Sequence, residues 1–257
     1  MSLIKKFRIK SFKEEKPMIE LKDLTISYGN RQIVEQLNLS IQKSEISGLL
    51  GPNGAGKSSI YHSIIGLIKP TFGKIFIDGI DATNIQTHKR CSQFGISWVP
   101  QYGGSWSDLT VLDNLMAIAE LHITNNEERI SKVNNLIRKF ELENVVKLKS
   151  KFLSGGQVRK LTLAMAMVKN TKILILDEPF AALDPQSVRI IQQIIVSLQM
   201  FEKISVTISD HSSRDLLSCV DSAMVLSEGK IVAKGTPQAL IKNTRAIEAY
   251  FGEGYKI

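Results

Sequence analysis

Disulfide frameworks, long apolar runs and signal segments are absent from this sequence. The 257 residues include two cysteines, Cys91 and Cys219, which are too few for a disulfide framework and have no histidines at metal-binding spacing. No apolar run approaches the roughly 18–20 residues of a membrane-spanning helix. No apolar segment of a secretory signal lies near Met1. These absences argue against a disulfide-rich secreted scaffold and against an integral membrane protein, and we expect a protein of the reducing cytoplasm.

Charge is unevenly distributed along the chain. The formal net charge is +8, and half of it comes from residues 1–17, which form a basic segment. Such a segment is a candidate for contact with anionic lipid. Its apolar residues do not share one helical face, which favours a solvated, disordered extension. No DNA or RNA motif accompanies the basic charge, so we expect no nucleic-acid partner.

The first motif lies between a predicted strand and a predicted helix. An apolar stretch at 46–50 precedes the string Gly51-Pro52-Asn53-Gly54-Ala55-Gly56-Lys57-Ser58, and apolar residues at helical spacing follow it. Glycines let consecutive backbone N–H groups curl around an anion, and the start of a helix adds its positive dipole. The pattern predicts a phosphate-binding loop in which Lys57 reaches phosphate oxygens and Ser58 ligates Mg²⁺. A glycine-rich turn before a buried helix is the alternative.

Two acids end a second apolar stretch. The run at 173–176 is typical of a parallel strand buried on both faces, and Asp177 and Glu178 follow it directly. Carboxylates at the carboxyl end of a central strand lie where an α/β sheet binds its ligand. We expect Asp177 to hold Mg²⁺ through water, and Glu178 to orient or deprotonate an attacking water. An ordinary strand end with solvent-facing acids is the alternative.

A third motif opens a predicted helix. Ser154 suits an N-cap, and the glycines that follow it leave the helix start free of side chains, which favours an anion. Ser-Gly-Gly alone is more typical of a linker. Here it stands within the string Leu153-Ser154-Gly155-Gly156-Gln157, the signature of ATP-binding cassettes. With all three motifs in order, the chain from about residue 19 to its end resembles the nucleotide-binding subunits of ABC transporters, which bind and hydrolyse ATP with Mg²⁺.

The resemblance implies roles for further residues. Tyr28 matches the aromatic residue that stacks on adenine, although plain strand packing also fits it. Ser59 extends the ATP-binding set, in a position where threonine is more usual. Gln101 matches the glutamine that touches Mg²⁺ and the attacking water, and His211 matches the switch histidine at the γ-phosphate. The loop that crosses the dimer seam in the family matches Ala182-Leu183-Asp184.

The resemblance also implies a homodimer. The phosphate loop and the signature are separated by about a hundred residues, and in this family a signature does not fold back onto its own loop. Two copies would pair head to tail, so that Ser154 and Gly156 of one cover the phosphate held by Lys57 of the other. Closing and opening of the pair would drive integral membrane permease subunits, from a peripheral position on the cytoplasmic face of the inner membrane.

Residues beyond Gln101 bear on the transported molecule. Trp106 matches an aromatic residue in the groove that receives the permease, and filling of the subdomain core is the alternative. A branched-chain amino-acid importer is one candidate, and a soluble ABC ATPase acting on nucleic acid or ribosomes is a candidate from another class. Lipopolysaccharide exporters are the subfamily most closely resembled, through Asp113-Asn114-Leu115-Met116-Ala117, Pro179-Phe180-Ala181 and Ala249-Tyr250-Phe251-Gly252-Glu253.

The element pattern agrees with an α/β fold of this kind. We expect an ABC-type P-loop NTPase with a mixed or parallel RecA-like core sheet, a helical signature subdomain at about 102–169, and an antiparallel β layer. That layer is predicted by two alternating runs within 19–41. The expected divisions are a basic N-terminal extension, an ATP-binding domain and a C-terminal tail, at 1–17, 18–242 and 243–257 respectively.

Overall fold

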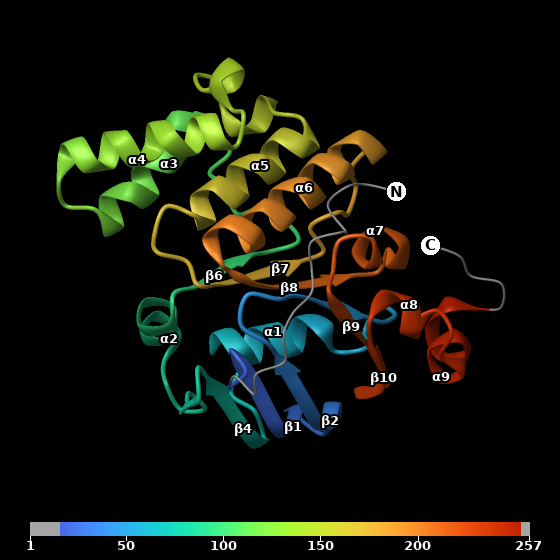
Figure 1. Cartoon of the computed structure of the whole chain (residues 1–257). Helices are drawn as coiled ribbons and strands as arrows, with labels where there is room; N and C mark the ends of the chain where they lie inside the picture. Colours follow the sequence, from blue (N-terminus) through green and yellow to red (C-terminus); the bar gives the residue numbers. More distant parts are fainter. Residues whose placement is uncertain (1–15, 253–257) are drawn as a thin grey trace.

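Two β-sheets and the helices around them form the structure, a computed structural model that describes residues 16–252 (Figure 1). Most of the predicted N-terminal extension, residues 1–15, lies outside the described residues, and so do residues 253–257 of the predicted tail. No helix of the described part is long and apolar enough to cross a membrane.

The first sheet is the antiparallel layer expected from the alternating runs. Its strand order is β2-β1-β4-β5, and its strands are β1 (Ile19–Tyr28), β2 (Arg31–Ile41), β4 (Phe72–Ile77) and β5 (Ile80–Asp81). The buried positions of β1 change parity between Leu21 and Leu24, where the register with β2 shifts. Asp23 adopts a φ of 49° at this point. Such a bulge returns the apolar side chains to the same face after one extra residue.

The second sheet is the mainly parallel core. Its order is β10-β9-β3-β8-β7-β6, and only β10 pairs antiparallel to its neighbour. Gly229 makes the turn between β9 and β10 with a φ of 76°, a conformation that glycine adopts readily. The strands are β3 (Ile46–Leu50), β6 (Ile96–Val99), β7 (Ile173–Asp177), β8 (Ser205–Asp210), β9 (Ser222–Ser227) and β10 (Lys230–Gly235).

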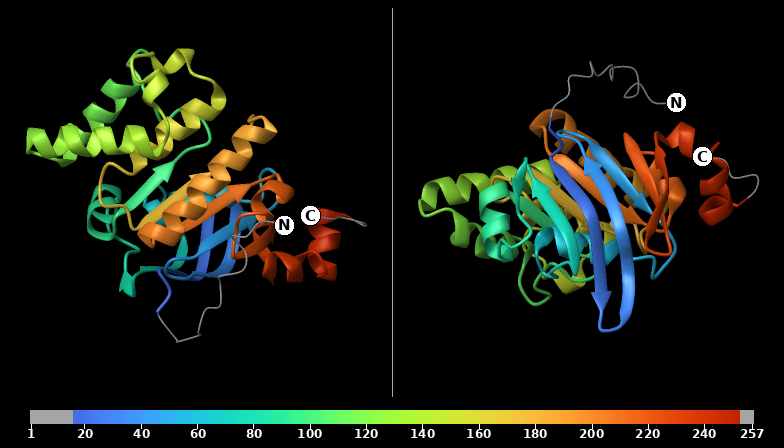
Figure 2. Two further views of the ribbon diagram at one scale, coloured as in Figure 1. Left: turned by 45° about the horizontal axis from the view of Figure 1, so that its top comes forward. Right: turned by 90° about the horizontal axis from the view of Figure 1, so that it is seen from below.

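The two sides of the core sheet face two different hydrophobic clusters. Along β7, Ile173 and Ile175 join the cluster that fills the space to the antiparallel sheet, while Leu174 and Leu176 join the cluster beneath the helices. The helix α1 (Lys57–Ile65) packs into the first cluster, and the view from below shows the antiparallel strands crossing in front of it (Figure 2). Burial on both faces explains the uninterrupted apolar run, because each such side chain contributes about 1.5–3 kcal/mol.

Helices cover the other side of the core sheet. In Figure 1, α3 and α4 stand above the sheet, and α5 and α6 lie across β6–β8. Both α3 and α5 begin with a capping box, made by Thr110 with Asp113 and by Ser154 with Gln157. The helices beyond α1 are α2 (Thr87–Phe94), α3 (Val111–His122), α4 (Asn126–Lys139), η2 (Glu143–Val145), η3 (Ser150–Phe152), α5 (Gly155–Ala166), α6 (Pro185–Glu202), α7 (Ser213–Leu217), α8 (Pro237–Leu240), α9 (Thr244–Ala246) and η4 (Ile247–Phe251).

A buried arginine joins α1 to α2. Arg90 is 1% exposed and donates hydrogen bonds of 2.7 Å and 2.8 Å to the carbonyls of Ser63 and Ile64 in the last turn of α1. It also donates to the carbonyls of Thr83 and Ile85, just before α2. A cation at a helix C-terminus interacts favourably with the helix dipole and satisfies carbonyls that have no partner within the helix.

Candidate functional site

A cavity of about 410 Å³ lies where the phosphate-loop motif, the β1–β2 hairpin and the ends of two core strands meet. Nine of its lining residues are among those predicted from the sequence, and two were not predicted, Arg31 and Ile33 at the start of β2. Pro52 and Ala55, also predicted, line an adjoining cavity together with Arg31. The nine predicted residues are Tyr28, Asn53, Gly54, Gly56, Lys57, Ser58, Ser59, Gln101 and Glu178.

Gly56 allows the loop to turn into α1. Its φ is 104°, and a Cβ at this position would stand 2.9 Å from Val34 Cγ2. Gly56 is also the N-cap of α1, and no side chain caps the helix start. Because the first N–H groups of a helix have no partner within it, this end of α1 presents donors and a positive dipole to the cavity.

Lys57 is a buried cation at the same place. The residue is 5% exposed, and its Nζ donates to the carbonyls of Gly51 and Pro52 at 2.7 Å and 3.1 Å. Burial lowers the pKa of Lys57, and the nearby carboxylates, with Glu178 the strongest among them, oppose this shift. A bound polyanion would compensate the buried charge, and this geometry suits the phosphate loop expected from the sequence.

Glu178, of the acidic pair at the end of β7, contacts two residues from distant parts of the chain beside the cavity. Gln101 Nε2 donates to Glu178 Oε2 at 2.6 Å, and His211 Nδ1 lies 3.2 Å from the same oxygen. Glu178 has a φ of 48°, in a region that non-glycine residues seldom occupy. Backbone strain of this kind persists where surrounding structure imposes it, and it is concentrated at functional sites. The fold therefore brings together the carboxylate, amide and imidazole groups that the sequence placed far apart.

Two further carboxylates, those of Asp177 and Asp210, lie near Lys57. Asp177 Oδ1 accepts a hydrogen bond of 2.5 Å from Ser209 Oγ, across the pair of strands β7 and β8. Asp210 is fully buried, and burial raises its pKa although the backbone N–H groups of Ser212 and Phe180 oppose the rise. The site thus places three acids close to one lysine.

The donor set suits Mg²⁺. Ser58, Gln101 and Asp177 offer a hydroxyl, an amide and a carboxylate oxygen. Within residues 16–252, no three His, Cys, Asp or Glu side chains are grouped as metal ligands. Mg²⁺ prefers to keep several waters and to bind one or two protein groups plus phosphate oxygens, so a sparse set of hard ligands beside a phosphate loop fits it.

Tyr28 presents its ring to solvent. The residue is 49% exposed, and its hydroxyl lies 3.4 Å from Ser59 Oγ. Plain packing inside the sheet would bury the ring, so the structure does not support that alternative. An exposed aromatic face at the mouth of the cavity can stack on a flat ring.

The signature residues lie apart from this cavity. None of the residues 153–157 is among those that line it. Gly156 instead packs against α6, where a Cβ would stand 2.5 Å from Ser187 Oγ, and Gly155 approaches Leu183 of the predicted seam loop. Asp184 in that loop caps α6 by accepting from the backbone N–H groups of Gln186 and Ser187. The fold brings the signature and the seam loop together, but not the signature and the cavity of the same chain.

Trp106 lies on the surface of the helical region. It is 47% exposed, so the alternative in which it fills the subdomain core is wrong. The fully buried Asn114 fixes the loop, because its side chain accepts from the Trp106 N–H at 2.8 Å and donates to the Trp106, Leu109 and Thr110 carbonyls. Asn114 was noted in the sequence only as part of a run, and its structural role was missed.

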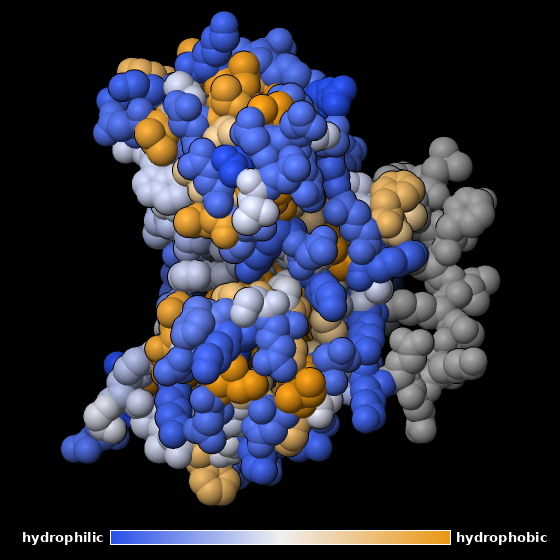
Figure 3. All heavy atoms as spheres, turned by 90° about the vertical axis from the view of Figure 1, so that its left-hand side faces the viewer, coloured by the Kyte–Doolittle hydropathy of each residue, from blue (hydrophilic) through white to orange (hydrophobic). Residues whose placement is uncertain are grey.

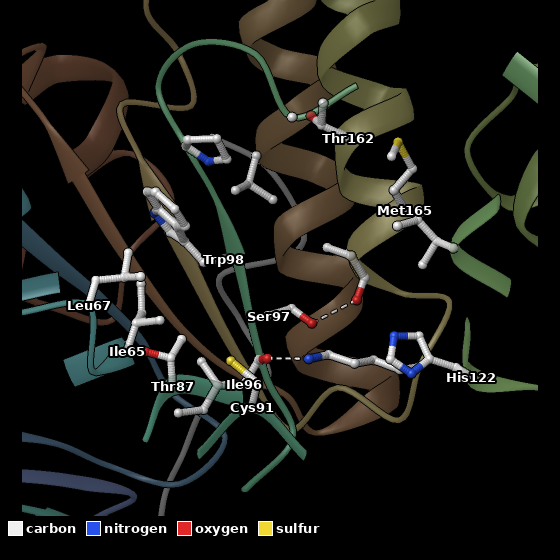
Figure 4. Close-up of a pocket in the computed structure, with 16 residues that line it drawn as sticks. Ile65, Leu67, Thr87, Cys91, Ile96, Ser97, Trp98, His122, Thr162 and Met165 are labelled. Carbon is white, nitrogen blue, oxygen red and sulfur yellow. Dashed lines mark hydrogen bonds between the residues drawn. The ribbon is translucent and has the colours of Figure 1, made fainter. Parts of the chain in front are cut away.

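A second cavity, of about 340 Å³, separates α2 and the end of α1 from α3 and α5. In Figure 4, Leu67 and Thr87 lie on one side of it, and Met165 and His122 lie on the other. Its lining includes Pro100 and Gly104 but not Trp106. The outer face that carries α2 and α4 shows apolar side chains scattered among hydrophilic ones (Figure 3).

Comparison with known proteins places these features in context. Residues 34–181 match the family profile described as "ABC transporter". The lipopolysaccharide export system ATP-binding protein LptB of Haemophilus influenzae is 36% identical over 93% of this chain and 99% of its own length. LptB of Escherichia coli K12 is 35% identical over 92% and 98%. A dimeric ATP-binding cassette solved in a post-hydrolysis state with ADP and Pi is 26% identical, with a TM-score of 0.77 over 86% of this chain and 99% of that one.

Proposed function

The chain belongs to the ABC transporter family, and from this premise we propose that it is the ATP-hydrolysing subunit of a lipopolysaccharide export transporter. The observation that carries the enzymatic part is the group formed by Glu178, Gln101 and His211 beside the cavity that contains Lys57. The identity of 35–36% over almost the whole chain with lipopolysaccharide export ATPases supports the substrate.

In the proposed reaction, ATP binds with its phosphates on the loop and its adenine against Tyr28. The N-terminal N–H groups of α1 and the Lys57 ammonium neutralise the phosphate oxygens, and Arg31 adds a cation at the cavity wall. Ser58 and Gln101, with Asp177 acting through water, would hold Mg²⁺, which supplies charge neutralisation at the phosphate oxygens when bound.

Glu178 and its two partners would act on the attacking water. The oxygen of that water forms a bond to the γ-phosphorus as the bond to the bridging oxygen of ADP breaks, and the Glu178 carboxylate accepts the water proton. Gln101 and His211 orient that carboxylate through the contacts of 2.6 Å and 3.2 Å. ADP and phosphate are the products.

We propose further that two copies complete the site. Residues 153–157 do not line the cavity of their own chain, and Ser154 and Gly155 at the start of α5 are exposed. In a twofold pair, Ser154 and Gly156 of one copy would cover the phosphate bound by Lys57 of the other. Residues 182–184 would lie at the seam.

A mixing experiment tests this division of the site. Lys57→Ala and Ser154→Arg variants are purified separately and combined after verified subunit exchange. Each variant alone should be inactive, and the mixture should recover activity, because one composite site in each mixed dimer is intact. Absence of recovery in proven heterodimers would contradict the composite site.

The partner would be an integral membrane permease, with this chain bound peripherally at the cytoplasmic face of the inner membrane. The second cavity and the exposed Trp106 support a docking surface beside the helical region. We also propose the domain boundaries expected from the sequence, with the ATP-binding domain at 18–242 between the N-terminal extension and the C-terminal tail. Purification of the tagged protein from membranes should recover polytopic subunits, whereas recovery of ribosomes or DNA would favour a soluble ABC ATPase.

The substrate is tested with the reconstituted complex. ATPase activity in proteoliposomes should rise with added lipopolysaccharide and stay unchanged with leucine or isoleucine. The opposite response would favour a branched-chain amino-acid importer. A catalytically inactive Glu178→Gln complex serves as the matched control for contaminating ATPases.

A further inference from the structure

Arg159 connects the signature helix to the loop that carries Gln101. It lies in the second turn of α5, two residues after Gln157, and is 8% exposed. Its Nη1 donates to the Pro100 carbonyl at 3.1 Å, and its Nη2 donates to the Gln101 carbonyl at 3.2 Å. Both acceptors are backbone carbonyls of successive residues, so the guanidinium holds the course of this loop rather than one side chain.

The two carbonyls belong to Pro100 and Gln101, and Gln101 is itself a member of the proposed catalytic group. The side chain of Gln101 donates to Glu178, which in turn contacts His211. A continuous set of contacts therefore runs from Glu178 through Gln101 to Arg159 and α5. Burial lowers the pKa of Arg159, and the charge of Asp210 opposes this shift.

The other end of this connection is the signature. The capping box of Ser154 and Gln157 fixes the first turn of α5, with bonds of 2.9 Å and 3.3 Å. Gly156 lies so close to Ser187 that no Cβ could be accommodated without a shift. The capping box joins Ser154 to the same short helix that carries Arg159, so a shift of Arg159 would be passed to the first turn of α5.

We propose that Arg159 is a positioning residue that couples the two ATP sites of the dimer. It would transmit a change at Gln101 of one site to the signature residues that cover the other site. The inference rests on the composite site proposed above, and it assigns the communication between the two sites to one side chain that touches neither nucleotide.

Arginine is needed here because its planar fork reaches two successive carbonyls at once. A lysine keeps the charge but presents a single ammonium, and a methionine keeps most of the volume without a donor. Neither substitution alters the residues that line the nucleotide cavity. The two variants therefore change the bonds between α5 and the Gln101 loop without replacing a residue of the nucleotide cavity.

The test measures ATP hydrolysis and nucleotide binding by the full-length homodimer. The wild type should hydrolyse ATP cooperatively, with a Hill coefficient above 1 and at most about 2 for two sites. In Arg159→Met, the Hill coefficient should fall to about 1 and kcat by about tenfold, with the Kd for ATP of the single protomer within about twofold of wild type. Arg159→Lys should recover part of the cooperativity.

Lys160→Met is the matched control. Lys160 is the next residue of α5, but its Nζ pairs with Glu141 at 2.6 Å, away from Gln101. This variant should keep wild-type cooperativity. Thermal unfolding of each variant establishes that it is folded. If Arg159→Met does not fold, the Hill coefficient of Arg159→Lys compared with that of the wild type tests the inference.

Two results would overturn the inference. One is an unchanged Hill coefficient in a folded Arg159→Met variant. The other is a decrease of the Hill coefficient in Lys160→Met that equals the decrease in Arg159→Met. Failure of the proposed function would look different, because the wild type itself would then show no ATP-dependent dimer and no ATPase activity.

Discussion

Glu178 and Gln101 lie 77 residues apart in the chain and are joined by a hydrogen bond of 2.6 Å between Glu178 Oε2 and Gln101 Nε2. The bond connects the end of β7 to the loop that follows its neighbour β6. The amide donor holds in place one oxygen of the carboxylate that is proposed to accept the water proton. The contact therefore orients Glu178 before the substrate arrives.

Glu178→Gln should separate ATP binding from hydrolysis. The amide keeps the size of the side chain but does not accept the water proton, so kcat should fall by about 10²- to 10⁴-fold while ATP still binds. The variant should accumulate as a dimer in size-exclusion chromatography with ATP and Mg²⁺. A variant that stays monomeric under these conditions would count against the composite site.

Lys57→Ala should lose nucleotide affinity. The ammonium is the buried cation of the phosphate loop, and its charge-assisted bonds to phosphate have no replacement in alanine. Binding of a fluorescent ATP analogue should weaken by at least about tenfold. Unchanged affinity in the folded variant would remove the phosphate-loop assignment.

The pKa of Lys57 predicts an alkaline pH dependence. Because burial lowers this pKa below its ordinary 10.5, the folded protein loses a proton in a window where the unfolded chain keeps it. Stability without nucleotide should therefore rise with pH in that window, just below 10.5, as the cost of the buried charge disappears. ATP affinity should fall over the same window, because a neutral amine attracts phosphate less. Urea unfolding and ATP titrations of wild type and Lys57→Met check both signs, and equal pH profiles of the two proteins would contradict them.

Trp106→Ala should keep basal ATPase activity and weaken coupling to the permease. The side chain is half exposed and lines neither cavity, so its removal should leave folding and the ATP site intact. Asn114→Leu removes the buried amide that holds the same loop and should reproduce the loss of coupling with lower stability. Basal and permease-stimulated ATPase rates, with thermal unfolding, distinguish the two, and full stimulation in Trp106→Ala would exclude the docking role.

Arg90→Met should destabilise the fold. Four carbonyls would lose their bonds to the guanidinium, and the Ser63 carbonyl would keep only its bond from the Gly66 N–H. We expect a decrease of about 2–4 kcal/mol in the free energy of unfolding. Lys89→Met is the matched control, because Lys89 is an exposed residue of the same helix. Urea denaturation measures both variants, and equal stabilities would show that the bonds of Arg90 contribute little.

Local chemistry made much of this protein predictable. The string at 51–58 requires glycine where the loop turns into α1, and Gly56 has the positive φ that this turn needs. The apolar run at 173–176 is explained by burial on both faces of a parallel strand. Ser154 and Gln157 form the capping box that their spacing of three residues suggests. Motifs of this kind depend on neighbours in the sequence, and the sequence therefore contains the information.

Other features depended on the path of the chain. Neither Arg31 nor Arg159 belongs to a recognised sequence motif, and the surroundings of each depend on the residues that the fold places beside it. Arg90 stands in a polar stretch of sequence, and its burial follows from the close approach of α1 and α2. Trp106 could have faced the core or the solvent, since its hydropathy fits both.

The sequence alone determined the phosphate loop, the acids at the strand end, the signature and the α/β order, because each arises from spacing within a few residues. The tertiary structure decided which of these meet: Glu178 joins Gln101 and His211, while residues 153–157 stay outside the cavity of their own chain. The physical reason is that parallel strands bring their carboxyl ends to one edge, whereas α5 packs on the opposite side of the sheet from the phosphate-loop helix.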